Sequence, residues 1–310
     1  MNADAEKTIA KAEGLELRLI DNRSPPDVLR KIVAFESVHP IRDENDLRNR
    51  MAENRRIYGL FHKGSVDGLV VFVEAAVIRG RCGGIQRLLD ETPPADDARE
   101  SDRVIFYSIN NARKGLVRNS FAGLLIKMAA MELRERFPSL AFFSTLSPIP
   151  GFGVWLDEHL REGEETILSP GEEAELDVAS GEKGVFRTLL STAWRESPRI
   201  AQAMKTPLLR LCARYLLSTV QKGGRSPRAI DAVENFHLSN GAFVERINWL
   251  GDISEKGMKQ SAGLLVNYLY DFSKTDSYGR LYRETGEIVS SPDVKALAGP
   301  QKAELSTGGF

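Results

Sequence analysis

Three short stretches in the first 110 residues of the chain are almost continuously apolar. They are RIYGLFHK (56–63), GLVVFVEAAVI (68–78) and RVIFYSI (103–109). Apolar runs of this length, rich in β-branched and aromatic residues, predict buried strands. Only GSVD separates the first two runs, which predicts an antiparallel hairpin.

Other segments repeat their apolar residues with helical spacing. SPPDVLRKIVAFESV (24–38) has apolar residues at 28, 29, 32 and 33, with Ser24 as the expected cap and proline at the first helical positions. The same spacing runs through residues 120–136, and residues 184–194 and 199–220 are also predicted to be helical.

The middle of the chain therefore has the order strand, polar loop, helix, strand, ending with LAFFSTL (140–146). Such a unit directs a helix N-terminus and the ends of two strands toward one crevice, where ligands of open α/β sheets bind. Residues 241–250 and 262–272 are strand-like, and the acidic stretch 170–183 is expected to be a surface loop. The fold class predicted is α/β (α+β): an open mixed sheet flanked by helices, with additional helices after the central unit.

The polar ends of the chain set the expected domain boundaries. Residues 1–22 are expected to be a tail and entry segment, residues 23–290 one catalytic domain, and residues 291–310 a weakly structured C-terminal tail. A chain of 310 residues is long enough for one large domain with a helical annex.

Charge and cysteine content exclude several classes of function. The 42 Lys and Arg nearly balance the 43 Asp and Glu, so no broad cationic field is available and nucleic acid is not expected as a partner. Cys82 and Cys212 form no C-x-x-C pair, and the four histidines show no metal-ligand spacing. No signal-peptide core or membrane-span window is present, so we expect a soluble, cytoplasmic protein without membrane contact.

Three blocks hold the candidate chemistry: FSTLSPIPGF (143–152), a long segment around His237 (213–252), and SAGLLVNYLYD (261–271). Taken singly, each has an ordinary structural explanation. A serine before proline commonly begins a turn, which applies to Ser147. A single histidine is more often a hydrogen-bonded structural residue, and Tyr268 and Tyr270, two apart on a strand, can simply pack across strands.

Taken together, the blocks resemble the malonyl-CoA decarboxylase family. That family carries F-S-x-L-S-P-I-P-G-F, then A-R-Y-L…F-H-L-x-N-G-A…R-I-N-W, then N-Y-x-Y, in the order found at 143–152, 213–249 and 267–270. AFESVHPIRDENDLRNRM (34–51) is also similar to the entry of the family's catalytic domain, so the resemblance covers roughly residues 15–290.

The resemblance implies a catalytic domain of the GNAT acyltransferase type that converts malonyl-CoA to acetyl-CoA and CO2, without a metal or organic cofactor. By the family's assignment, Ser147 acts on the malonyl group as proton acceptor, His237 donates a proton, and Tyr270 is the active-site tyrosine. The residue types suit this chemistry, because loss of CO2 leaves an enolate that hydrogen-bond donors stabilise and a general acid protonates. An imidazole with a pKa near ~6.5 is suited to that last step.

Two departures from the family pattern leave alternatives open. The family's catalytic domain normally follows a helical domain that helps to build its oligomer, and this chain starts near the catalytic domain, so a monomer or small homo-oligomer is expected. The coenzyme loop, where glycines are usual, contains Arg118 and Ala122. The residues expected to bind the coenzyme are Val117, Arg118, Asn119, Ser120, Phe121, Ala122 and Gly123.

Because this loop departs from the family pattern, the sequence leaves open which carrier holds the malonyl thioester. A decarboxylase acting on the phosphopantetheine arm of an acyl carrier protein is one alternative, and an acyltransferase of the same fold is another. The third is a binding or regulatory protein that has lost catalysis, against which the joint presence of Ser147, His237 and Tyr270 argues.

Overall fold

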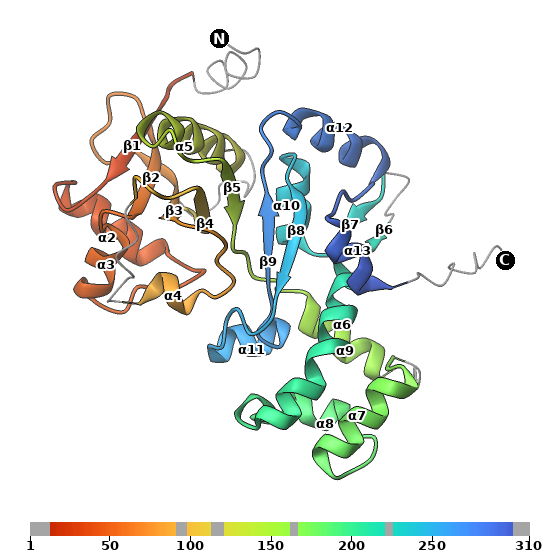
Figure 1. Cartoon of the computed structure of the whole chain (residues 1–310). Coiled ribbons are helices and arrows are strands. Elements are labelled where there is room, and N and C mark those ends of the chain that lie inside the picture. The colour runs from red at the N-terminus through yellow and green to blue at the C-terminus, as the bar shows by residue number, and fades with distance from the viewer. Residues whose placement is uncertain (1–12, 91–97, 113–120, 162–166, 221–225, 300–310) are drawn as a thin grey trace. The chain divides into compact units, whose positions relative to one another are not determined.

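The computed structural model describes residues 13–90, 98–112, 121–161, 167–220 and 226–299. It contains a seven-stranded sheet of order β1-β2-β3-β4-β5-β9-β8 and a small ribbon of β6 and β7 (Figure 1). The predicted mixed sheet flanked by helices is confirmed. The strands are β1 (Leu15–Ile20), β2 (Arg55–His62), β3 (Leu69–Ile78), β4 (Arg103–Asn111), β5 (Phe142–Thr145), β6 (Thr219–Val220), β7 (Arg228–Ala229), β8 (Phe243–Asn248) and β9 (Leu265–Leu269).

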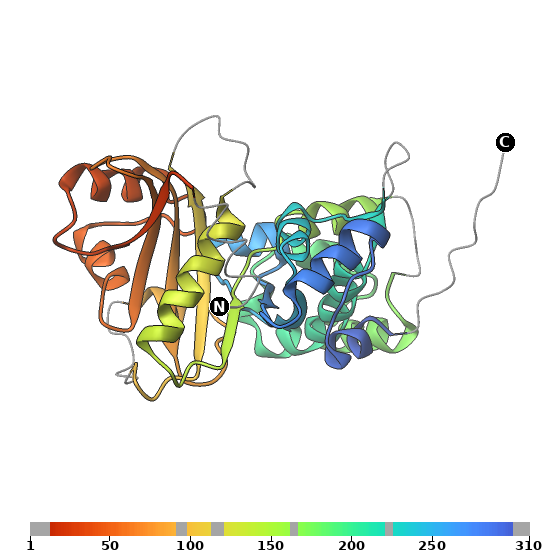
Figure 2. The ribbon, with the colours of Figure 1, turned by 90° about the horizontal axis from the view of Figure 1, so that it is seen from above.

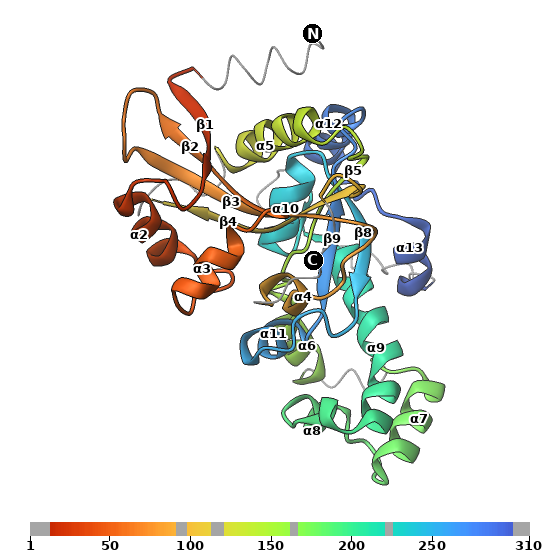
Figure 3. The same ribbon diagram turned by 60° about the vertical axis from the view of Figure 1, so that its left-hand side comes forward.

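The chain forms two compact units, residues 1–147 with 267–275, and residues 148–266 with 276–310. The first unit holds β1 to β5 and the end of β9. Its helices are α2 (Pro26–Phe35), α3 (Glu44–Arg50), α4 (Gln86–Leu89) and α5 (Ala122–Arg136). Figures 2 and 3 show α5 on one face of β2 to β4, and α2 and α3 on the other.

Helices on both faces explain why β3 is almost entirely apolar, with Glu74 as its one charged residue. All ten of its residues are buried, so this strand has no solvent face and shows no alternation of apolar and polar residues. The β3–β4 register shifts in the middle: Glu74 pairs with Ser108, and Ala75 pairs with Phe106. Tyr107 is thus an extra residue in β4, a β-bulge of the kind that redirects a strand.

The second unit is mainly helical and includes β8 and the start of β9. Its helices are α6 (Phe152–Arg161), α7 (Pro170–Ser180), α8 (Phe186–Leu190), α9 (Pro198–Leu216), α10 (Ala232–Ser239), α11 (Glu255–Ser261), α12 (Thr275–Thr285) and α13 (Pro292–Ala298). None of the helices in the described ranges is long and apolar enough to cross a membrane.

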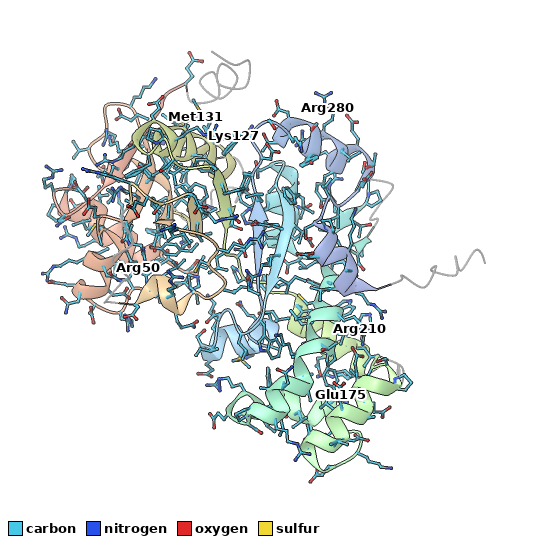
Figure 4. The ribbon with its side chains drawn as sticks, in the orientation of Figure 1. Arg50, Lys127, Met131, Glu175, Arg210 and Arg280 are labelled. Atoms are coloured by element: carbon cyan, nitrogen blue, oxygen red, sulfur yellow. The ribbon has the colours of Figure 1, made fainter. Side chains whose placement is uncertain are left out.

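One sequence prediction in this unit is wrong: residues 170–180 are helix α7, not a surface loop. A capping box begins the helix, in which the Ser169 hydroxyl accepts the N–H of Glu172 and the Glu172 carboxylate accepts the N–H of Ser169. Arg210 of α9 then binds the same carboxylate, donating from Nε over 2.8 Å. Figure 4 shows Arg210 on α9, beside α7.

Both predicted chain ends contain regular structure. Residues Leu15–Ile20 form β1, which pairs antiparallel with β2, so the sheet begins before the boundary predicted at residue 22. Near the other end, Pro292–Ala298 form α13, capped by the Ser291 hydroxyl, inside the segment predicted as a tail. At α2 the predicted cap also differs, because the Ser24 hydroxyl accepts the N–H of Asp21 and does not cap that helix.

Candidate active site

The position of Ser147 follows from the parallel pair β4 and β5. Their register runs from Arg103 opposite Phe142 to Phe106 opposite Thr145, and the N–H of Leu146 still donates to the carbonyl of Phe106. β5 then ends, while β4 continues along β3 to Asn111. Ser147 therefore lies just beyond the carboxyl end of a parallel pair, where open α/β sheets place their ligands.

The hydroxyl of Ser147 is held by neighbouring groups of the first unit. Its Oγ donates to Thr145 Oγ1 over 2.9 Å, and the same Thr145 oxygen accepts the backbone N–H of Tyr268 over 3.1 Å. The residue is only 5% exposed. These contacts fix the direction of the hydroxyl to a degree that a surface turn serine does not need.

Asn267 reinforces the end of β5. Its Nδ2 donates to the carbonyl of Thr145 over 2.6 Å and to the carbonyl of Cys82 over 3.5 Å. Sequence reasoning missed Thr145 and Asn267 as members of this site. The available signal was weak: Thr145 lies two residues before Ser147 and so shares its strand face, and Asn267 opens the N-Y-x-Y block.

Tyr270 lies elsewhere along the same pair of strands. Ser144 is opposite Leu269, and the N–H of Tyr270 donates to the carbonyl of Phe143 over 2.8 Å. By this register the backbone of Tyr270 lies opposite Phe143, four residues of strand, roughly 13 Å, before Ser147. Burial raises the pKa of Tyr270 far above its usual range, so its phenol is neutral and can donate a hydrogen bond.

His237 lies in the last turn of α10, in the second unit. Burial of this residue, which is 3% exposed, lowers its pKa to about 3, although the C-terminal end of a helix favours a positive charge. The cost of desolvating a cation therefore exceeds the helix-end effect. The expected pKa near ~6.5 does not apply to this buried imidazole, which is neutral at pH 7.

Glu234 lies one turn before His237 on the same helix. Its carboxyl group is completely buried, and neither oxygen has a hydrogen-bond partner among the residues that the structure describes. Burial, and then the charge of Asp231, raise the pKa of Glu234 well above its usual range. Burial therefore favours the neutral form of this carboxyl group.

The predicted coenzyme loop is described only at its end. Val117, Arg118, Asn119 and Ser120 lie outside the described residues, while Phe121 precedes α5 and Ala122 and Gly123 are buried in its first turn. Within the described part of the chain, no side chain caps the N-terminus of this helix. Its first N–H groups are the kind of donor that binds phosphate.

The described residues offer no group of three or more His, Cys, Asp or Glu side chains that could hold a metal ion. Cys82 and Cys212 are buried thiols. The functional groups on hand are thus the Ser147 hydroxyl with its Thr145 partner, a neutral imidazole, a neutral phenol and the start of α5.

The chain also matches a protein family over most of its length. The family model described as "Malonyl-CoA decarboxylase C-terminal domain" matches residues 14–307. The chain belongs to the malonyl-CoA decarboxylase family.

Members of that family are similar over most of this chain. Mitochondrial malonyl-CoA decarboxylase of Rattus norvegicus is 35% identical over 294 residues, which are 91% of this chain and 59% of that protein. Malonyl-CoA decarboxylase of Agrobacterium vitis is 36% identical with a TM-score of 0.82, covering 96% of this chain and 70% of that one. The enzyme of Rhodopseudomonas palustris is 35% identical with a TM-score of 0.79, covering 94% and 68%.

Proposed function

We propose that this chain decarboxylates malonyl-CoA to acetyl-CoA and CO2. The observation that carries the proposal is the family match over residues 14–307, together with the position of Ser147 just beyond the carboxyl end of the β4–β5 pair. The chain spans 59% of the length of the rat relative, so the activity of the whole relative is carried over here as a proposal.

The reaction breaks one C–C bond of the malonyl group. Both electrons of that bond pass to C2 and into the thioester carbonyl, giving an enolate, and the carboxylate leaves as CO2. One proton added to C2 then gives the acetyl thioester, so each turnover consumes one proton. Hydrogen-bond donors aimed at the enolate oxygen lower the barrier as its charge develops.

Ser147 and His237 are assigned to the malonyl group in this proposal. The buried hydroxyl of Ser147, directed by Thr145, binds the malonyl group. His237 is neutral in the free protein and so has no spare proton to give. A malonyl carboxylate next to the imidazole favours its charged form, so substrate binding draws in the proton that His237 later donates to C2.

Tyr270 and α5 serve other parts of the substrate. A thioester of coenzyme A is long enough to contact both Ser147 and a residue four strand positions away. The neutral phenol of Tyr270 supplies a hydrogen-bond donor there. The N-terminal N–H groups of α5, with the positive charge of Arg118, bind the pyrophosphate.

Coenzyme A is the carrier that the proposal names, and a carrier-protein thioester is its runner-up. The proposed setting is the cytoplasm, and the proposed assembly is a monomer or small homo-oligomer. The reaction needs no metal or organic cofactor in this proposal, because the thioester itself accepts the electrons.

The test supplies malonyl-CoA and malonyl-loaded acyl carrier protein in separate incubations, and identifies the products by mass spectrometry. Acetyl-CoA with an equal amount of CO2 supports the proposal. If acetyl carrier protein is the dominant product, the substrate is the runner-up, a carrier-protein thioester. Transfer of an intact acyl group to an added amine or thiol acceptor, without CO2, points instead to the acyltransferase.

A further inference from the structure

Asp231 is an almost completely buried carboxylate that joins three segments of the second unit. It is 1% exposed. Its Oδ2 accepts the backbone N–H of Gly151 over 3.0 Å and the hydroxyl of Tyr215 over 3.3 Å. Its Oδ1 accepts the N–H groups of Val233 over 2.8 Å and Glu234 over 3.2 Å. One side chain thus binds the start of α6, helix α9 and the N-terminus of α10.

The Gly151 contact matters because of what precedes it. Gly151 ends the segment S-P-I-P-G that begins at Ser147, and each proline fixes its own φ. The side chain of Ile149 between them is fully buried. Few backbone rotations remain in this segment, so holding the N–H of Gly151 also limits where the chain leaves Ser147.

Gly151 also has to be glycine at this point. A Cβ there would lie 2.2 Å from the hydroxyl oxygen of Tyr215 and 3.3 Å from Asp231 Oδ2. The first distance is well inside van der Waals contact, so any larger residue would push the tyrosine or the loop away. The close approach brings the Gly151 N–H within reach of the carboxylate.

The other oxygen of Asp231 controls α10. It is the N-cap of this eight-residue helix, and His237 follows six residues later. We propose that Asp231 is a positioning residue for the decarboxylation, which holds the segment after Ser147 and the helix of His237 in one fixed arrangement. This inference rests on the proposed function for its effect on turnover.

Helix capping alone does not explain the residue. Asp43 caps α3 with the same two-contact pattern, accepting the N–H groups of Asn45 and Asp46, and it remains exposed. At residue 231 the carboxylate is buried, which is costly unless both oxygens are satisfied. A serine or asparagine would cap α10 equally well. The second oxygen is what binds Gly151 and Tyr215 as well.

The test compares Asp231→Asn with the matched control Asp43→Asn. The asparagine oxygen can still cap α10, but its NH2 group then faces the N–H of Gly151, donor against donor. We expect kcat to fall by about 10-fold to 10²-fold with KM nearly unchanged, because the reacting groups are displaced while most substrate contacts remain. Asp43→Asn should leave both constants unchanged. A folded Asp231→Asn protein with wild-type kcat overturns the proposal.

A second set of variants covers the case in which Asp231→Asn fails to fold. Gly151→Ala should lower kcat strongly, because its Cβ meets the Tyr215 hydroxyl. Adding Tyr215→Phe removes that oxygen and leaves the ring carbon at the ordinary distance of 3.4 Å. The double variant should therefore recover at least about 10-fold in kcat over Gly151→Ala. Full activity of Gly151→Ala, or no recovery in the double variant, counts against the proposed positioning role of Asp231.

A readout without substrate separates this inference from the proposed function. Hydrogen exchange of the Gly151 amide should be faster in Asp231→Asn, or in Tyr215→Phe, than in the wild type, whether or not the chain decarboxylates anything. If exchange is unchanged, Asp231 does not hold this segment. If exchange accelerates but the wild-type protein releases no CO2, Asp231 does hold the segment around Gly151, and the proposed function is wrong.

Discussion

The hydroxyl of Ser147 donates to the hydroxyl of Thr145 over 2.9 Å, and that second hydroxyl is fixed in turn by the N–H of Tyr268. Thr145 is the last residue of β5, and Tyr268 belongs to the neighbouring strand β9. The direction of the Ser147 hydroxyl is therefore set by a strand pair that forms between distant parts of the chain.

Replacing Thr145 by valine tests this relationship. Valine keeps the shape but removes the oxygen, so the Ser147 hydroxyl and the N–H of Tyr268 both lose the hydrogen bond that they donate to Thr145. We expect kcat to fall by about 10-fold and the free energy of unfolding to fall by about 1–3 kcal/mol. Thr145→Ser keeps the oxygen and should retain most of both. Equal activity of the valine and serine variants would show that Ser147 needs no such orientation.

The buried His237 should make folding stability fall on acidification. Its pKa is about 3 in the folded protein and about 6.5 when unfolded. Between these values the unfolded chain binds the extra proton, so this contribution is fully present above about pH 6.5 and is lost as pH falls toward 3. Wild type should therefore lose up to about 1.4 kcal/mol per pH unit relative to His237→Gln. Urea unfolding of both proteins between about pH 5 and pH 7 measures the difference; parallel curves would mean that the imidazole is not desolvated.

A buried cluster of charges in the first unit should make folding stability fall as pH rises, opposite to the effect of His237. Arg50, the last residue of α3 (Figure 4), donates to Asp46 and to Glu74, each over 3.0 Å. The Arg50 contact favours the charged form of Glu74. Burial, followed by the negative charge of Glu36, outweighs that contact and raises the pKa of Glu74 to about 8. Arg50 is shared between Asp46 and Glu74, and Arg42 also pairs with Asp46.

The Glu74→Gln variant tests the raised pKa. The stability linked to a raised pKa is fully present below the unfolded value near 4.5, and is lost as pH rises through about 8. Glutamine cannot ionise, so the variant should gain stability relative to wild type as the solution becomes more alkaline from about pH 6 to pH 9. Unfolding by urea at several pH values gives the slope. A constant difference in the free energy of unfolding between the two proteins across this range would show that Glu74 does not have the raised pKa.

The coenzyme loop allows a prediction from sequence, since Arg118 lies outside the described residues. If its charge replaces glycine contacts at the pyrophosphate, CoA binding should weaken as salt rises, because exposed charges are screened over ~10 Å at 0.1 M. Arg118→Ala should then bind CoA more weakly and with less salt dependence, measured by calorimetry. The exposed Arg48 of α3 offers a control, as Arg48→Ala should not change binding. Tighter binding by Arg118→Gly would show that the arginine obstructs the phosphate.

Local pattern was enough to predict the elements that bury a continuous apolar surface. Strands β2, β3 and β4 and helix α5 were all expected close to their observed bounds, because runs and helical spacing reflect burial directly. Helix α7 was not predicted, because the acidic, Gly-containing composition of residues 170–183 is typical of a surface loop. The Ser169–Glu172 capping box is the local signal that starts the helix.

The site was only partly predictable for a different reason. Long blocks of sequence predict Ser147, His237 and Tyr270 as site residues. Their surroundings depend on contacts between distant segments, such as Asp231 with Gly151, 80 residues apart. The pKa of His237 depends on burial, which sequence spacing does not reveal.

Release of CO2 from malonyl-CoA by the purified chain is the most direct test of the central claim, run in parallel with Ser147→Ala and His237→Ala. We expect the wild type to release CO2 and form acetyl-CoA in equal amounts, and each variant, with unchanged melting, to lose about 10²-fold or more in kcat. No CO2 from the folded wild type would contradict the proposed activity. Wild-type turnover by a folded variant would remove that residue from the mechanism.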